Sequence, residues 1–132
     1  MDRYLVVLAG AGIGGLARYV AGAWIMAKYG GRFPLGTLVI NVTGSFIIGI
    51  AGALAVPEGR MDSQTRQFVT QFLMVGICGG YTTFSSFSLQ TLNLLREREW
   101  LYAGGNIVVS VVVCMIGVWL GWMLGSTFNS AK

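Results

Sequence analysis

Four apolar runs, separated by short charged connections, constrain the fold of this chain more than any other feature. They cover residues 4–27, 35–56, 66–95 and 100–125. A helix needs about 20 apolar residues to cross a bilayer, so each run is long enough to span one. Charged residues make up only 11% of the chain, against about 25% in soluble domains. We therefore predict one all-α membrane domain of four transmembrane helices, with the first run retained as a span.

The third run is longer than a bilayer requires. About 30 residues of continuous helix would measure roughly 45 Å, whereas the hydrocarbon core is about 30 Å thick. Its middle holds Gly79-Gly80-Tyr81-Thr82-Thr83-Phe84-Ser85-Ser86-Phe87-Ser88. Irregular backbone at membrane depth is tolerated only where it is buried in protein or lines a watery cavity. We predict that this helix is broken at mid-membrane, near residues 79–83, and that the functional site lies there.

Glycines recur every four residues in two other runs. Gly10 and Gly14 lie in the first run, and Gly117, Gly121 and Gly125 lie in the fourth. Small residues at this spacing let membrane helices approach closely. We interpret both sets as packing faces.

Basic residues are balanced between the two sides that a four-span topology defines. One side holds Arg3, Arg60, Arg66 and Lys132, and the other holds Lys28, Arg32, Arg96 and Arg98. Orientation follows the excess of Lys and Arg in short loops, so this balance favours insertion in both orientations. The alternative is a single orientation set by a weak signal or by the loop acids. Copies of opposite orientation can share a two-fold interface, which predicts an antiparallel homodimer.

Neutral polar and aromatic side chains recur at helical spacing on three runs. The sets are Thr37, Asn41 and Ser45; Phe84, Phe87 and Ser88; and Tyr102, Asn106 and Ser110. A single hydroxyl in such a set is more often a contact between helices, and two Phe one turn apart are more often packing. The hydrogen-bonding groups of the two larger asparagine side chains are harder to satisfy, and they favour a polar pathway on which the three sets converge.

Composition narrows what such a pathway could carry. The chain has no histidine, and none of its carboxylates falls within a predicted span, so the usual proton relays and cation sites are missing. Amide N–H groups, hydroxyls and the positive edges of phenyl rings suit a small anion. Cys78 and Cys114 favour apolar packing over a disulfide or a metal site. Arg18, the one basic residue inside a span, is expected either near a vestibule or capping a helix, or in a buried structural hydrogen bond.

Three segments together resemble a known family. The run from Gly79 to Ser88 is similar to the third-helix signature of the small bacterial fluoride channels, the Fluc or CrcB family. Gly36-Thr37-Leu38-Val39-Ile40-Asn41 resembles the second-helix motif of that family, and Gly14-Gly15-Leu16-Ala17-Arg18-Tyr19 resembles its first. Tyr81, Ser86 and Gln90 depart from the leucine, threonine and glutamate that are common at these positions.

The resemblance implies an antiparallel dimer with two pores that exports fluoride passively across the bacterial inner membrane. It assigns the pathway to Phe84, Phe87, Asn41, Thr37, Asn106 and Ser110, with Thr83, Ser88 and Tyr102 beside them. It also implies a structural, non-transported sodium ion held at the dimer centre by the backbone carbonyls of Gly79 and Thr82.

Three other classes compete with this interpretation. A small multidrug exporter also has four spans, but it needs a membrane-embedded carboxylate, and the first run has none. A scaffolding subunit of a larger membrane complex would use the polar sets only as helix contacts. An enzyme is disfavoured, because the chain lacks a nucleophile beside a base.

Overall fold

The computed structural model describes residues 2–130, and every regular element in that range is a helix. The first two helices are α1 (Arg3–Tyr29) and α2 (Leu35–Leu54). The third span is built from α3 (Ser63–Phe68), the wider π-helix η1 (Val69–Cys78), α4 (Gly79–Tyr81) and α5 (Phe84–Arg96). The last helix is α6 (Trp100–Ser130).

Four stretches of helix are long and apolar enough to cross a membrane: Arg3–Tyr29, Leu35–Leu54, Ser63–Arg96 and Trp100–Asn129. The predicted all-α class with four membrane-spanning helices is therefore confirmed. The third stretch starts at Ser63 rather than at residue 66, because Asp62 caps it. The Asp62 carboxylate accepts the backbone N–H groups of Gln64 and Thr65, each at 2.9 Å. The hydrogen bonds from Thr65 hold the pKa of this carboxyl below its usual value.

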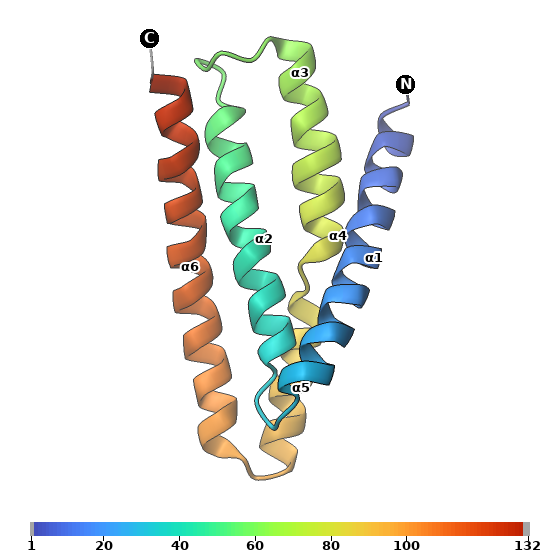
Figure 1. Cartoon of the computed structure of the whole chain (residues 1–132), viewed down its shortest axis with the longest axis vertical. Helices are drawn as coiled ribbons and strands as arrows, with labels where there is room; N and C mark the ends of the chain where they lie inside the picture. The colour runs from blue at the N-terminus through green and yellow to red at the C-terminus, as the bar shows by residue number, and fades with distance from the viewer. Residues whose placement is uncertain (1, 131–132) are drawn as a thin grey trace.

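Consecutive spans alternate in direction, as Figure 1 shows. The N-terminus, the C-terminus and the connection from α2 to α3 lie at one end of the bundle. The α1–α2 and α5–α6 connections lie at the other end, where Arg32 Nη1 donates to Glu99 Oε1 at 2.6 Å. This ion pair ties together two loops that are far apart in the sequence.

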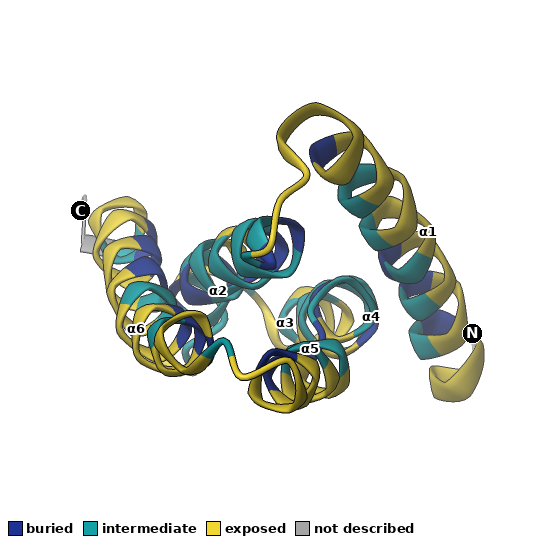
Figure 2. Ribbon diagram, turned by 90° about the horizontal axis from the view of Figure 1, so that it is seen from below, coloured by how far each residue is buried: buried dark blue, intermediate teal, exposed yellow. Residues whose placement is uncertain are grey.

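The glycine faces pack helices within the chain. On α1, a Cβ added at Gly10 would lie 2.5 Å from the Phe72 carbonyl oxygen, and one at Gly14 would meet the Ile77 carbonyl. The backbone of α1 therefore lies directly against η1. Figure 2 shows the matching pattern, with the exposed side of α1 turned outward and its buried positions turned inward.

The glycines of α6 do the same against α2. A Cβ at Gly117 would lie 3.2 Å from the Val42 carbonyl oxygen, and one at Gly121 would meet the Phe46 carbonyl. Gly49 on α2 packs against α6 in the same way, because its Cβ position faces the Val118 carbonyl of α6. Both glycine sets are thus packing faces, as predicted.

Adding one methyl group at this contact should destabilise the protein. We expect Gly121→Ala to lower the unfolding free energy by about 1–3 kcal/mol, since the new Cβ meets backbone that cannot move aside cheaply. Gly104→Ala is the matched control, because nothing lies within 4 Å of its Cβ position. Thermal unfolding in detergent measures both variants. Equal melting temperatures for the two would contradict this account of the α2–α6 contact.

Candidate functional site

The helical path of the third span is interrupted at two residues. Helix α4 ends at Tyr81 and α5 begins at Phe84, while Thr82 (φ −80°, ψ 158°) and Thr83 (φ −152°, ψ 109°) are extended. Gly79 and Gly80 are helical, so the non-helical part is narrower than the predicted 79–83 region. Gly80 serves packing instead, since a Cβ there would lie 2.5 Å from the Ala11 carbonyl oxygen.

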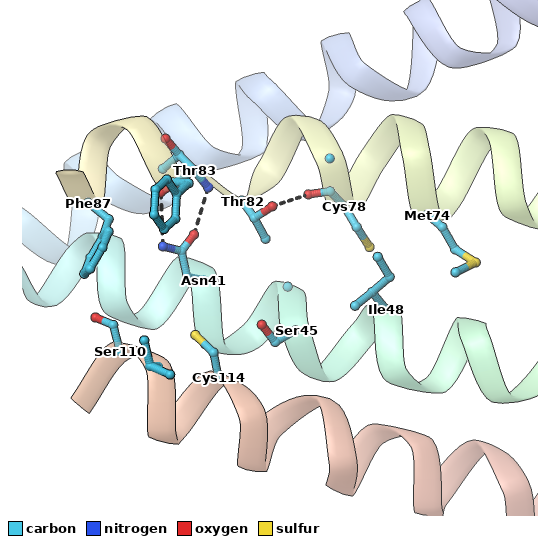
Figure 3. A pocket seen from close by; sticks show the side chains of 14 residues that line it. Asn41, Ser45, Ile48, Met74, Cys78, Thr82, Thr83, Phe87, Ser110 and Cys114 are labelled. Atoms are coloured by element: carbon cyan, nitrogen blue, oxygen red, sulfur yellow. Dashed lines mark hydrogen bonds between the residues drawn. The ribbon is translucent and has the colours of Figure 1, made fainter. Parts of the chain in front are cut away.

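The polar groups around the interruption find partners inside the protein. The Thr83 N–H donates to Asn41 Oδ1 at 2.8 Å, and Asn41 Nδ2 donates to the Thr83 carbonyl at 3.2 Å. One side chain of α2 thus binds both backbone groups of Thr83, as the dashed lines in Figure 3 indicate. The Thr82 N–H and Oγ1 both donate to the Cys78 carbonyl at 2.9 Å. Thr83 Oγ1 caps α5 by accepting the Ser86 N–H at 3.2 Å.

A cavity of about 340 Å³ opens beside this interruption, between α2, the third span and α6. We call it the central cavity (Figure 3). Its wall includes seven predicted site residues: Asn41, Gly79, Thr82, Thr83, Phe84, Phe87 and Ser110. The rings of Phe84 and Phe87 lie 5.3 Å apart at 45°. Phe84 is 78% exposed in the single chain, so most of its ring has no neighbour within this chain.

Thr37 lies at a different cavity, although it shares a helix face with Asn41. This second cavity, of about 660 Å³, opens between α1, α2 and α5, and we call it the Arg18 cavity. Its polar wall residues include Arg18, Thr37, Ser86 and Gln90. Thr83 lines both cavities, so the residue that Asn41 holds is part of the wall of each.

Asn106 lies in the core, with 2% of its surface exposed. Its Nδ2 donates to Thr91 Oγ1 at 2.9 Å, and its Oδ1 accepts from Ser110 Oγ at 3.3 Å. Thr91 Oγ1 in turn donates to the Phe87 carbonyl at 2.8 Å. This chain of hydrogen bonds joins α6 to α5 one helical turn after Phe87.

Besides the buried Asn106, two predicted residues line neither cavity. Ser88 is exposed and donates to the Phe84 carbonyl at 2.9 Å, as hydroxyls in helices commonly do. Tyr102 is 41% exposed. Helical spacing put Ser88 on the face of Phe84 and Tyr102 on the face of Ser110, but only Phe84 and Ser110 reach the central cavity.

Sequence reasoning missed several residues of the site. Thr91 follows Phe87 by four residues, and Cys114 follows Ser110 by four, so the same periodicity could have found them. Cys114 lines the central cavity together with Ser45, which the sequence had already placed in a polar set with Asn41. Gln90 has a buried Oε1 that, within residues 2–130, is the one buried side-chain polar atom without a hydrogen-bond partner. No sequence pattern predicts that.

Backbone carbonyls at the interruption fit a hard cation. In a continuous helix the Thr83 N–H would bond the Gly79 carbonyl, but here it bonds Asn41 instead. Gly79 is also exposed in the single chain, which leaves its carbonyl available. The described residues contain no cluster of three or more His, Cys, Asp or Glu. Oxygen atoms are the ligands that hard cations prefer, so main-chain carbonyls are the suitable donors in this part of the chain.

The central cavity offers a small ligand uncharged polar groups and ring edges. Asn41 uses one amide hydrogen on Thr83 and retains a second, and Ser45 adds a hydroxyl, whereas the Ser110 hydroxyl donates its hydrogen to Asn106 Oδ1. The five carboxylates of the sequence all lie outside the four spans. The fold and the cavity together define a small helical membrane protein with a cavity lined by uncharged residues among its spans.

This chain belongs to the CrcB family. The family model described as "CrcB-like protein, Camphor Resistance (CrcB)" matches residues 5–122. A protein of Opitutus terrae named fluoride-specific ion channel FluC is 49% identical, with 100% of this chain and 98% of the relative covered. A FluC of Methylocella silvestris is 48% identical over 98% of this chain and 97% of its own. One of Rhodospirillum rubrum is 52% identical over 89% and 90%. These relatives are named as channels, in agreement with the expectation that the chain is not an enzyme.

Asn41→Leu should destabilise the third span. Leucine has a similar volume but leaves the Thr83 N–H and carbonyl without partners, at about 1–3 kcal/mol for each unsatisfied group. Asn93→Leu, at an exposed position of α5, is the matched control. Melting temperature and amide hydrogen exchange at Thr83 measure the effect. Unchanged protection of the Thr83 amide in Asn41→Leu would contradict the double hydrogen bond.

Proposed function

We propose that this protein is a fluoride channel of the bacterial inner membrane. It lets fluoride leave the cytoplasm passively and so lowers its internal concentration. The observation that carries the proposal is the central cavity, in which Asn41, Phe87 and Ser110 from three helices line one space. Relatives of nearly full coverage that are named fluoride-specific channels support the same ion.

The chemistry of the cavity suits an ion that is hard to dehydrate. Conduction needs sites that replace the hydration shell yet release the ion again. Neutral donors and ring edges attract an anion more weakly than an arginine would, which permits release. The cavity and its neighbours also lack the carboxylate that a proton-coupled cation exporter requires.

We further propose that two chains of opposite orientation form the functional dimer, with two pores. The support is the exposure of site residues in the single chain: Phe84 is 78% exposed, and Gly79 is exposed as well. A ring that is to face an ion must not face lipid, and a second copy would cover it. In this arrangement the third span is broken at mid-membrane in both copies, and the two interruptions face each other.

The same arrangement gives the carbonyls of Gly79 and Thr82 a role. Two copies would bring four such oxygens together, and a sodium ion held there would neutralise carbonyls that lost their helical partners. When bound, the ion supplies fixed positive charge near the pathway. Two residues of this chain hold the surrounding backbone: Asn41 binds the extended Thr83 peptide, and Asn106 joins α6 to α5 through Thr91, one turn from Phe87.

Purified protein in liposomes should release fluoride down a gradient and retain chloride. Phe84→Ile and Phe87→Ile should each lower the fluoride flux at least about tenfold, the equivalent of roughly 1.4 kcal/mol at the barrier. A fluoride electrode measures the flux, and cross-linking checks that the dimer persists. Leu89→Ile, an exposed apolar position on the same helix, is the control. Equal release of chloride would refute selectivity, and normal flux in both Phe variants would remove the rings from the pathway.

Both orientations should coexist in the membrane. Single cysteines from Met61→Cys and Gly31→Cys, on a background without Cys78 and Cys114, mark the two ends of the bundle and leave the balance of Lys and Arg unchanged. A membrane-impermeant thiol reagent should label about half of each population in intact cells and all of it after permeabilisation. Labelling of only one position from outside would overturn dual insertion.

A further inference from the structure

Arg18 forms a hydrogen bond that the interruption of the third span makes possible. Its Nη1 donates to the Thr82 carbonyl at 3.3 Å, across 64 positions of sequence. In a continuous helix this carbonyl would accept the Ser86 N–H, which instead bonds Thr83 Oγ1 at 3.2 Å. The guanidinium thus donates to a carbonyl that has lost its hydrogen-bond partner in the helix.

The charge on Arg18 persists in this setting. An arginine stays protonated in proteins, so it brings a full positive charge into the span. The Arg18 cavity provides polar surroundings for that charge, since Thr37, Ser86 and Gln90 lie in the same wall. Gln90 Oε1 is buried and has no hydrogen-bond partner in the described part of the chain.

We propose that Arg18 sets the affinity with which the Thr82 carbonyl binds a monovalent cation. This inference rests on the proposed sodium site and concerns the residue that regulates it. A carbonyl oxygen has two lone pairs, so the guanidinium and a cation can share it. The donated hydrogen bond draws electron density from the oxygen, and the guanidinium repels a cation bound there. Both effects weaken cation binding, so removal of the Arg18 charge should raise the affinity for the cation.

The size of the effect follows from the distance. A cation sits about 2.4 Å from a ligating oxygen, which puts it within about 6 Å of the Arg18 guanidinium. At an effective dielectric constant of about 20, repulsion over this distance corresponds to roughly a hundredfold in affinity, and water in the Arg18 cavity reduces it. We therefore expect at least a tenfold change when the charge is removed and the hydrogen-bond donor is kept.

The test uses the full-length protein in detergent. Melting temperature is measured against sodium concentration, with N-methylglucamine chloride holding ionic strength constant. Arg18→Gln retains an N–H donor without charge, and its half-maximal sodium concentration should fall at least tenfold. Arg18→Lys keeps the charge and should stay within about threefold of the unmodified protein. Arg3→Gln, exposed at the far end of α1, should not change the midpoint.

An unchanged or raised sodium midpoint in Arg18→Gln would overturn the inference. If that variant does not fold, the guanidinium proton signals of Arg18 in the unmodified protein decide instead. Sodium titration should shift those signals, and no shift overturns the inference. Fluoride efflux from liposomes is recorded for the same samples. If fluoride efflux is selective but sodium has no effect on stability, the role of Arg18 is refuted and the channel function stands. If sodium affects stability but efflux is not selective, the channel function is refuted and the role of Arg18 stands.

Discussion

The Asn41 side chain binds both the N–H and the carbonyl of Thr83, and the rest of the site depends on this pair of hydrogen bonds. Lipid offers no partner to a free peptide group, so a span can leave the helical path only where protein satisfies it. Asn41 supplies a donor and an acceptor in the spacing of a peptide group. The Thr82 hydroxyl donates to the Cys78 carbonyl, and Arg18 donates to the Thr82 carbonyl. The extended residues can then stand in the middle of a span without a large loss of stability.

Close backbone packing makes these contacts reachable. Arg18 meets Thr82 because α1 lies directly against η1 and α4, and that distance is set by Gly10, Gly14 and Gly80. On the other side, Gly121 brings α6 against α2, so that Ser110 shares a cavity with Asn41. In a membrane such packing replaces the hydrophobic drive that would gather helices in water. The glycines therefore belong to the site as much as its polar residues do.

The fold class, the four spans and the polar residues that could gather near the third span were predictable from the sequence. Apolar run lengths and the four-residue spacing carry that information, because both follow from helix geometry. They do not say which helix faces which. Thr37 and Asn41 share one face of α2, yet they line different cavities, and Thr83 borders both. The interruption was expected to include Gly79 and Gly80, but both glycines stay helical, and Gly80 packs against Ala11 of α1. Thr91 was missed although its spacing was available, because its partner Asn106 lies on another helix.

Thr83 lies in the wall of both cavities, and Asn41 of α2 binds its N–H and its carbonyl. A movement of α2 relative to the third span is therefore transmitted to a residue that borders two separate spaces. A substitution on α2 that shifts Asn41 can change the shape of both spaces, although Asn41 itself lines only the central cavity.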